Sequence, residues 1–438
     1  MTAESTILLV ALLALAAVLA WLYHRFRKTR ILVTGYGDEL EHRIMAKLIR
    51  VFHESHAGIE VVFRQYPYKD YARAVLAEIR RGTGPDVVMM SSIHFSDLVL
   101  RGVLEPLNSQ FLHSGLDINA FYPQAIDRFF LDGYLYALPR DVAPLCLVYY
   151  NRRAFEEAGL PPPRDDWDWD TFAATARKLV KVDATGRVIR WGFIEAWSMV
   201  ENWVYNAGGT MADDPKQPTR WTLAQDPKSL QGLQFRWDLI HKHKVMPPTS
   251  IWLGDDDRVA GEMFAEGKAA MILHGFWKTP RFREIRDFPW DVALLPKDRA
   301  GHRNYVLSGS AYGIPRTSRK KQAAWKFVKY ISAGEGAMKL AADGLVQPAL
   351  EKLAQSEAFL DGKDPQNKRI LLAAMKQGKY TPLCLNWPEI ELMILRELAP
   401  AWEGRESVED ALKRLGPMLD KNPPLRVPET GAVTPPSG

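Results

Sequence analysis

The sequence predicts an α/β fold arranged in two lobes, and three observations lead to this prediction. The chain has 438 residues, too many for one ordinary hydrophobic core and suited to two domains with extensions. Strand and helix patterns alternate over residues 31–90, in the β-α-β-α-β order of a mostly parallel sheet. A long apolar segment with two prolines follows at 139–150, as expected where extended chain crosses between lobes.

The elements of the first sheet can be placed one by one. Residues 31–37 form a buried strand that runs into a glycine turn, and 59–63 and 86–90 are further strands. Helices are expected at 39–55, where apolar residues recur at helical spacing, and at 69–81. Because ligands of such sheets bind beyond the carboxyl ends of the strands, the residues that follow each strand are candidate ligand contacts.

The rest of the chain reads as further helices around a second set of strands. Helices are expected at 151–159, 170–181, 228–243 and 322–332, and a helix end, a glycine turn and a strand at 264–273. Three more helical stretches close the chain, and no internal repeat occurs. The last residues, 422–438, are rich in Pro, Gly and Thr and are expected to be a disordered tail.

The N-terminus carries a membrane signal. Residues 7–23 form a 17-residue apolar run without a charge, at the lower limit for a membrane-spanning helix. Cleavage at Ala14-Leu15-Ala16 would leave only a short apolar core, and no cysteine follows for lipid modification. We therefore expect residues 1–29 to act as an uncleaved signal or membrane anchor.

The charged residues that flank this run predict one membrane orientation, and the expected location of the folded body requires the opposite one. Arg25, Arg27, Lys28 and Arg30 follow the run, and no Lys or Arg precedes it. The positive-inside rule would then place the folded body in the cytoplasm, although long domains translocate regardless of nearby charge. We expect the body to lie outside the cytoplasm.

Composition and motifs exclude several classes of function. The net charge of +5 comes largely from the N-terminal flank and predicts no nucleic-acid partner. Only Cys146 and Cys384 occur, and both are expected to be buried free thiols. The glycines do not form a phosphate loop, the histidine pairs lack zinc-site spacing, and 255–257 reads as a solvated turn or helix start rather than a calcium loop. We expect no cofactor, no metal and no catalytic residue.

Several stretches, in order along the chain, are similar to the segments of one family. They are 79–88 (IRRGTGPDVV), 102–107 (GVLEPL), 132–139 (DGYLYALP), 149–151 (YYN), 167–172 (WDWDTF, with Asp170 as the helix N-cap), 264–271 (FAEGKAAM), 308–315 (SGSAYGIP) and 323–327 (AAWKF). With them the chain resembles, over about residues 30–420, the family 1 extracellular solute-binding proteins of ABC importers, the group of the maltose-binding protein.

The resemblance implies a two-lobed periplasmic-binding-protein fold of type II, with a ligand cleft that closes by hinge motion. It places 30–139 plus 300–345 in lobe one and 145–298 plus 350–420 in lobe two. It implies a monomeric, non-enzymatic, extracytoplasmic subunit that captures a carbohydrate and delivers it to the permease subunits of an ABC importer.

Three alternatives stay open at this point. Arg140 near the crossing could serve a glycerol-phosphate-like or other polar solute. A glycoside hydrolase needs two carboxylates, which can come from distant positions in the sequence. A membrane-tethered sensor without an importer would have the same sequence features.

The candidate ligand contacts follow from the chemistry of a sugar, whose ring face stacks on aromatic side chains and whose hydroxyl rim bonds polar groups. The aromatic candidates, which the resemblance implies, are Trp197, Trp203, Trp277 and Trp387. The candidates at strand ends and in the crossing are Tyr36, Asp38, Ser91, Asp141, Ser310 and Tyr312. The competing roles are core packing for each Trp, a hinge hydrogen bond for Asp141 and a plain turn for Tyr36 and Asp38. Trp167 and Trp169 are assigned to structure.

Overall fold

The computed structural model of the protein describes residues 28–248 and 257–426. The predicted anchor at 7–23, Asp255, Asp256 and residues 427–438 of the predicted tail lie outside the described residues. In the part of the chain that is described, no helix has the length and apolar character needed to cross a membrane.

Lobe one is built on a five-stranded sheet in the order β2-β1-β3-β15-β6. The first three strands are parallel, as predicted; β15 pairs antiparallel with β3, and β6 pairs antiparallel with β15. The strands are β1 (Thr29–Tyr36), β2 (Ile59–Tyr66), β3 (Val87–Ser91), β6 (Ala137–Pro139) and β15 (Ser310–Gly313). The main helices are α2 (Glu39–Ser55), α3 (Tyr68–Arg80), α4 (Ser92–Leu100), α13 (Lys321–Ala333) and α14 (Glu335–Ala342). The helical spacing seen in the sequence places Ile44, Leu48 and Phe52 of α2 in the core.

Smaller elements complete lobe one. They are α5 (Asn108–Leu112), α6 (Pro123–Asp127) and the hairpin of β4 (Phe130–Leu131) and β5 (Tyr134–Leu135).

Lobe two is built on a four-stranded sheet in the order β11-β12-β8-β13. Its central strands are antiparallel, and only β11 and β12 run parallel. The strands are β8 (Leu147–Asn151), β11 (Ile194–Glu195), β12 (Met271–His274) and β13 (Trp290–Leu294). The helices are α7 (Arg152–Glu157), α8 (Trp169–Leu179), α9 (Val200–Asn206), α10 (Pro227–His241), α11 (Asp257–Ala265), α12 (Thr279–Phe282), α17 (Trp387–Trp402) and α18 (Val408–Lys421). A separate hairpin joins β9 (Lys181–Val182) and β10 (Val188–Arg190).

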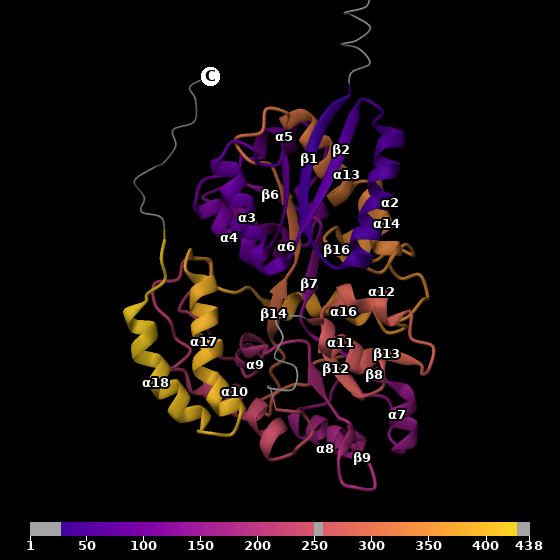
Figure 1. Cartoon of the computed structure of the whole chain (residues 1–438), viewed down its shortest axis with the longest axis vertical. Helices are drawn as coiled ribbons and strands as arrows, with labels where there is room; N and C mark the ends of the chain where they lie inside the picture. Colours follow the sequence, from indigo (N-terminus) through magenta and orange to yellow (C-terminus); the bar gives the residue numbers. More distant parts are fainter. Residues whose placement is uncertain (1–27, 249–256, 427–438) are drawn as a thin grey trace, which may run out of the picture.

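The two lobes lie one above the other in Figure 1, with β7 and β14 running between them. These strands form a small sheet in the order β16-β7-β14-β17. Its members are β7 (Asp141–Pro144), β14 (Tyr305–Ser308), β16 (Gln347–Pro348) and β17 (Gly378–Lys379). The apolar, proline-containing segment therefore does cross between the lobes, as predicted. Gly309 has a φ of +151°, and a Cβ there would lie 2.7 Å from the Asp141 carbonyl oxygen, so only glycine suits this close approach.

Three hydrophobic cores hold the molecule together. The first lies in lobe one and the second in lobe two, and the third joins α9 to the C-terminal helices α17 and α18. The segment after α14, with α15 (Glu351–Ala354) and α16 (Ile370–Ala374), serves both lobes. Ala354 and Met375 pack into the first core, and Phe359 and Leu371 pack into the second.

Local details both confirm and correct the sequence predictions. Cys146 and Cys384 are buried free thiols, as predicted. The N-cap of α8 is Asp168, whose carboxylate accepts a hydrogen bond from the Thr171 backbone N–H at 2.9 Å. The prediction of Asp170 as the cap was wrong, because Asp170 lies inside the first turn and pairs with Arg299 on the surface. In the expected tail, Leu425 and Asn386 are joined by a hydrogen bond.

Candidate functional site

The wall of lobe two that faces lobe one carries two stacked tryptophans. The rings of Trp197 and Trp277 are 6.1 Å apart and nearly parallel, with an interplanar angle of 19°. Both side chains are half-buried, so each keeps accessible surface. Trp277 follows β12, and its ring lies directly over Gly275, where a Cβ would approach the ring to 2.0 Å. The absence of a side chain at Gly275 therefore lets Trp277 lie flat on its own backbone.

A carboxylate fixes the orientation of Trp277. Its indole N–H donates to Asp257 Oδ2 at 3.1 Å, and Lys278 Nζ lies 3.4 Å from the other oxygen. Burial lowers the pKa of the neighbouring His274 to about 4 despite the nearby Asp257 carboxylate, so this imidazole is neutral near pH 7. Asp257 begins α11, as the predicted helix start at 255–257 required.

The facing wall of lobe one is also aromatic. Tyr36 ends β1, and its ring meets the rings of Tyr68 at 4.9 Å and of His94 at 5.2 Å, both edge to face. The Tyr68 hydroxyl lies 3.2 Å from Ser91 Oγ at the end of β3, and Ser91 also caps α4 by accepting from the His94 backbone N–H. The ends of the first and third strands therefore meet in one polar and aromatic surface, as their topology predicts.

Contacts across the gap bring the two walls together. Trp277 of lobe two packs against the first and the third core, and Ile93 of lobe one packs against the third core. These contacts place Trp277 and Ile93 at one junction between the lobes, which is the candidate ligand cleft.

Two acidic residues of lobe two, Glu201 on α9 and Glu391 on α17, have raised pKa values. Glu201 is in the first turn of α9 and is 6% exposed. Burial, together with the Glu195 carboxylate, raises the pKa of Glu201 to about 7. Burial and the charge of Glu201 raise the pKa of Glu391 to about 8. Near neutral pH both carboxyl groups are therefore partly protonated.

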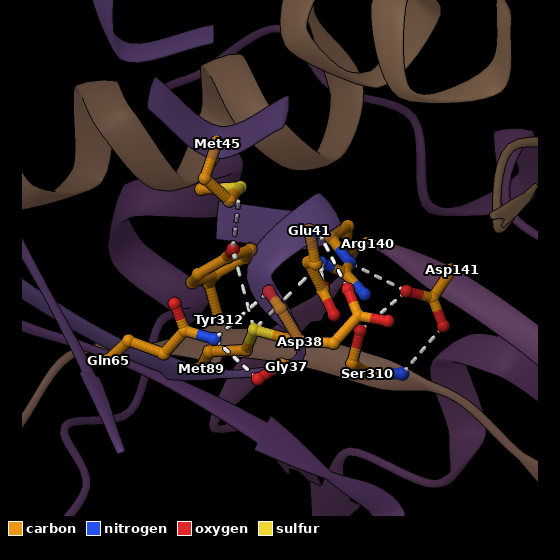
Figure 2. A network of polar contacts seen from close by, with 10 residues as sticks. All are labelled: Gly37, Asp38, Glu41, Met45, Gln65, Met89, Arg140, Asp141, Ser310 and Tyr312. Carbon is orange, nitrogen blue, oxygen red and sulfur yellow. Dashed lines mark hydrogen bonds and ion pairs between the residues drawn. The ribbon is translucent and has the colours of Figure 1, made fainter. Parts of the chain in front are cut away.

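The crossing between the lobes contains a second polar cluster, the hinge network, shown in Figure 2. Arg140 Nε donates to Asp141 Oδ2 at 2.6 Å, and its Nη1 donates to Glu41 Oε1 at 2.9 Å. The Ser310 backbone N–H donates to Asp141 Oδ1 at 2.8 Å, and the Ser310 hydroxyl donates to the other oxygen. Tyr312 is fully buried behind this cluster, with its hydroxyl near the sulfur atoms of Met45 and Met89.

The predicted site residues fall into two groups. Tyr36 and Ser91 both contact Tyr68 at the strand ends of lobe one, and Trp197 and Trp277 stack on each other in lobe two. Asp141 and Ser310 bond each other in the hinge network, which is the competing role that was expected for Asp141. Asp38 is exposed and caps α2, because its side chain accepts a hydrogen bond from the Glu41 backbone N–H.

The remaining predicted residues have no accessible surface in this conformation. Tyr312 lies in lobe one. Trp203 is fully buried and donates its indole N–H to Glu195 Oε2 at 2.8 Å. Trp387 is 1% exposed and packs against Trp221 in the third core. Trp167 and Trp169 are buried with hydrogen-bonded indole N–H groups, as their structural assignment required.

Sequence reasoning did not single out Tyr68, Glu201 or Glu391. Glu201 is the one charge in VENWVYN, whereas WPEIELMIL holds both Glu389 and Glu391, so composition does not mark Glu391. Glu391 lies one helical turn after the predicted Trp387.

With this geometry, the chain has the mixed α/β fold of a two-lobed binding protein. The sequence profile of the bacterial extracellular solute-binding proteins matches residues 37–338, more than half of the chain. The chain belongs to this family.

Relatives and solved structures agree with this assignment. The chain is 21% identical to a binding protein of Brucella abortus, covering 83% of this chain and 86% of that protein. It is also 21% identical to the sn-glycerol-3-phosphate-binding periplasmic protein UgpB of Pectobacterium atrosepticum, covering 82% and 84%.

Among solved structures, the ABC substrate-binding protein Lmo0181 of Listeria monocytogenes, in complex with cycloalternan, has a TM-score of 0.80 at 23% identity, covering 90% of this chain and 99% of that one. Maltose-bound MalE3 of T. maritima has a TM-score of 0.76 at 22% identity, covering 90% and 100%. These likenesses establish the shared fold.

Proposed function

We propose that this chain is the extracytoplasmic binding subunit of an ABC importer and that it captures a carbohydrate between its lobes. The observation that carries the proposal is the half-buried Trp197–Trp277 stack, in which Trp277 packs against the same lobe-one core as Tyr36. Flat aromatic faces with accessible surface suit the apolar face of a sugar ring. The carbohydrate-bound state of Lmo0181 and MalE3 supports the same ligand class.

A phosphorylated ligand, as the name of UgpB suggests for some relatives, is less well supported by the cleft. Arg140 is buried and bonded to two carboxylates. Arg128 donates to the carbonyl oxygens of Ser92 and Thr381, and Lys278 pairs with Asp257. These three cations are therefore already bonded to acceptors within the protein, which leaves them less available to a phosphate.

The proposal includes the location and assembly of the protein. Residues 7–23 would anchor the chain, with the body outside the cytoplasm, acting as a monomer with permease subunits. The proposed division is 30–139 plus 300–345 for lobe one and 145–298 plus 350–420 for lobe two, and the two separate sheets support it. Modification of an introduced surface cysteine by a membrane-impermeant reagent in intact cells tests the orientation, because a cytoplasmic body would stay unmodified.

Calorimetric titration of the full chain with a panel of oligosaccharides tests the function. We expect saturable binding with an intact ligand, as checked by mass spectrometry, and a loss of affinity of at least about tenfold in Trp197→Ala and Trp277→Ala. Released products would instead identify a hydrolase. Binding of glycerol 3-phosphate without binding of any saccharide would contradict the proposal.

A further inference from the structure

The end of lobe one that lies away from the cleft carries a basic hollow. It has a volume of about 810 Å³ and lies where β1 and β2 begin, at Thr29 and Ile59. The candidate ligand contacts of lobe one follow the opposite ends of its strands, so this hollow takes no part in the cleft. None of the described residues that line it is acidic. Its cations are Arg319, Lys320, Lys321 and Lys326.

The protein itself uses only some of these cations. Lys320 and Lys321 each pair with a carboxylate of lobe one, at 3.1 and 2.9 Å. Arg319 and Lys326 are exposed, and within residues 28–248 and 257–426 neither of them forms an ion pair. The basic hollow therefore keeps two positive charges that no acidic side chain of the described protein neutralises, and these charges attract an anionic partner.

An exposed apolar side chain lies beside this charge. Leu112 on α5 is 80% exposed, the largest value among the large apolar side chains that the structure describes. A hydrogen bond from Lys329 Nζ to the Ser114 carbonyl oxygen, at 2.6 Å, joins the end of α5 to α13, and Lys329 lies one helical turn after Lys326. Figure 1 shows α5 at the same end of lobe one as the start of β1. An apolar group beside cations suits the surface of a bilayer with anionic lipids.

The order of segments along the chain brings this surface close to a membrane. Only residues 24–28 separate the apolar run at 7–23 from Thr29. Because so short a connection spans at most about 20 Å, an anchor at 7–23 holds the start of β1 within that distance of the bilayer. Attraction between charges reaches about 8 Å at physiological ionic strength, so the connection allows the basic hollow to come within reach of the headgroups.

We propose that the basic hollow and Leu112 form a membrane-docking surface, which holds lobe one on anionic phospholipid headgroups. This inference rests on the proposed anchoring of the chain by residues 7–23. Headgroup phosphates neutralise Arg319 and Lys326, and the Leu112 side chain enters the boundary between headgroups and acyl chains. Because this surface and the cleft lie at opposite ends of lobe one, docking leaves lobe two free to move when the cleft closes.

Energy transfer between the full chain and labelled lipid tests the inference. A donor fluorophore is attached at Ser109→Cys on α5, since the native Cys146 and Cys384 are buried, and lipid headgroups carry the acceptor. The chain is reconstituted into vesicles of phosphatidylcholine or of an equal mixture of phosphatidylcholine and phosphatidylglycerol. Fluorescence lifetimes give the ratio of docked to undocked protein. This ratio should be at least about tenfold higher on the anionic vesicles, and about 1 M salt should remove the difference.

Charge variants identify the cations that make the contact. Arg319→Gln combined with Lys326→Gln should lower the ratio on anionic vesicles by at least about tenfold. Arg153→Gln combined with Lys178→Gln is the matched control, because both residues are exposed on the lobe-two helices α7 and α8 and the same two charges are removed. This control should leave the ratio unchanged. A donor at Ala184→Cys, in the turn between β9 and β10 of lobe two, should show little transfer on either vesicle.

The apolar part of the surface is tested by Leu112→Ser, which should lower the ratio on anionic vesicles by at least about threefold. Equal ratios on neutral and anionic vesicles, or an unchanged ratio in the double charge variant or in Leu112→Ser, would overturn the inference and leave the proposed anchor standing. Release of the wild-type chain from neutral vesicles in a flotation gradient would contradict the anchor and the inference with it. Carbohydrate binding is measured separately by calorimetry, so its failure is distinct from both.

Discussion

Two polar regions of the molecule differ in how their charges are satisfied. In the hinge network, Arg140, Asp141, Glu41 and Ser310 satisfy one another. In lobe two, burial and nearby negative charge raise the pKa values of Glu201 and Glu391. A satisfied network fixes geometry, whereas the stability contributed by acids with raised pKa values depends on pH. The comparison separates residues that hold the lobes together from residues whose charge responds to pH.

Asp141→Ala should produce the largest effect on stability. It leaves Arg140 with a single acidic partner and the buried Ser310 N–H without an acceptor, and breaking a buried pair costs about 3–5 kcal/mol. Thermal unfolding should show a loss of at least about 6 °C in Tm. A variant with unchanged Tm that no longer binds saccharide would make Asp141 a ligand contact instead.

Gly275→Ala tests whether the position of Trp277 matters. The added methyl would overlap the Trp277 ring, so the ring must leave the stack with Trp197 and its bond to Asp257. We expect about a tenfold loss of saccharide affinity, or about 1.4 kcal/mol, measured by calorimetry. Gly58→Ala on the surface, where a Cβ meets nothing within 4 Å, is the control. Full affinity in Gly275→Ala would show that the stack does not contact the ligand.

The acid pair predicts a smaller, pH-dependent effect on the unliganded protein. Burial raises the pKa of Glu391 from its ordinary value to about 8, so the folded state binds more protons than the unfolded chain between these pH values. The free energy of unfolding must therefore fall as pH rises through this window. The fall in Tm between pH 5 and pH 9 should be smaller in Glu391→Gln than in the wild type, and the difference should be roughly 2–4 °C. An equal fall in Tm in both proteins would show that ionisation of Glu391 does not destabilise the folded protein.

Local patterns made much of the fold predictable, and non-local packing decided the rest of the site. The parallel strands of lobe one and helix α2 follow from periodicity within each segment. The place of Trp277 just after β12 could be predicted from the strand pattern that precedes it. At α17, however, Trp387 enters the third core because α9 and α18 pack against that helix, which the sequence of α17 alone does not show. The indole N–H of Trp203 donates to Glu195, which is also bonded to Arg236. Nothing in the sequence marks Glu195 and Arg236 as partners of this tryptophan.

The most direct test compares two tryptophans that the sequence could not distinguish. Trp277 keeps accessible surface in the cleft, and Trp387 is 1% exposed in the third core. In calorimetric titrations with the saccharide that binds the wild type, Trp277→Ala should lose at least about tenfold in affinity with little change in Tm. Trp387→Ala should lose about 3–5 kcal/mol of stability, while its folded fraction keeps wild-type affinity. Full affinity in a folded Trp277→Ala variant would contradict a ligand bound between the aromatic walls.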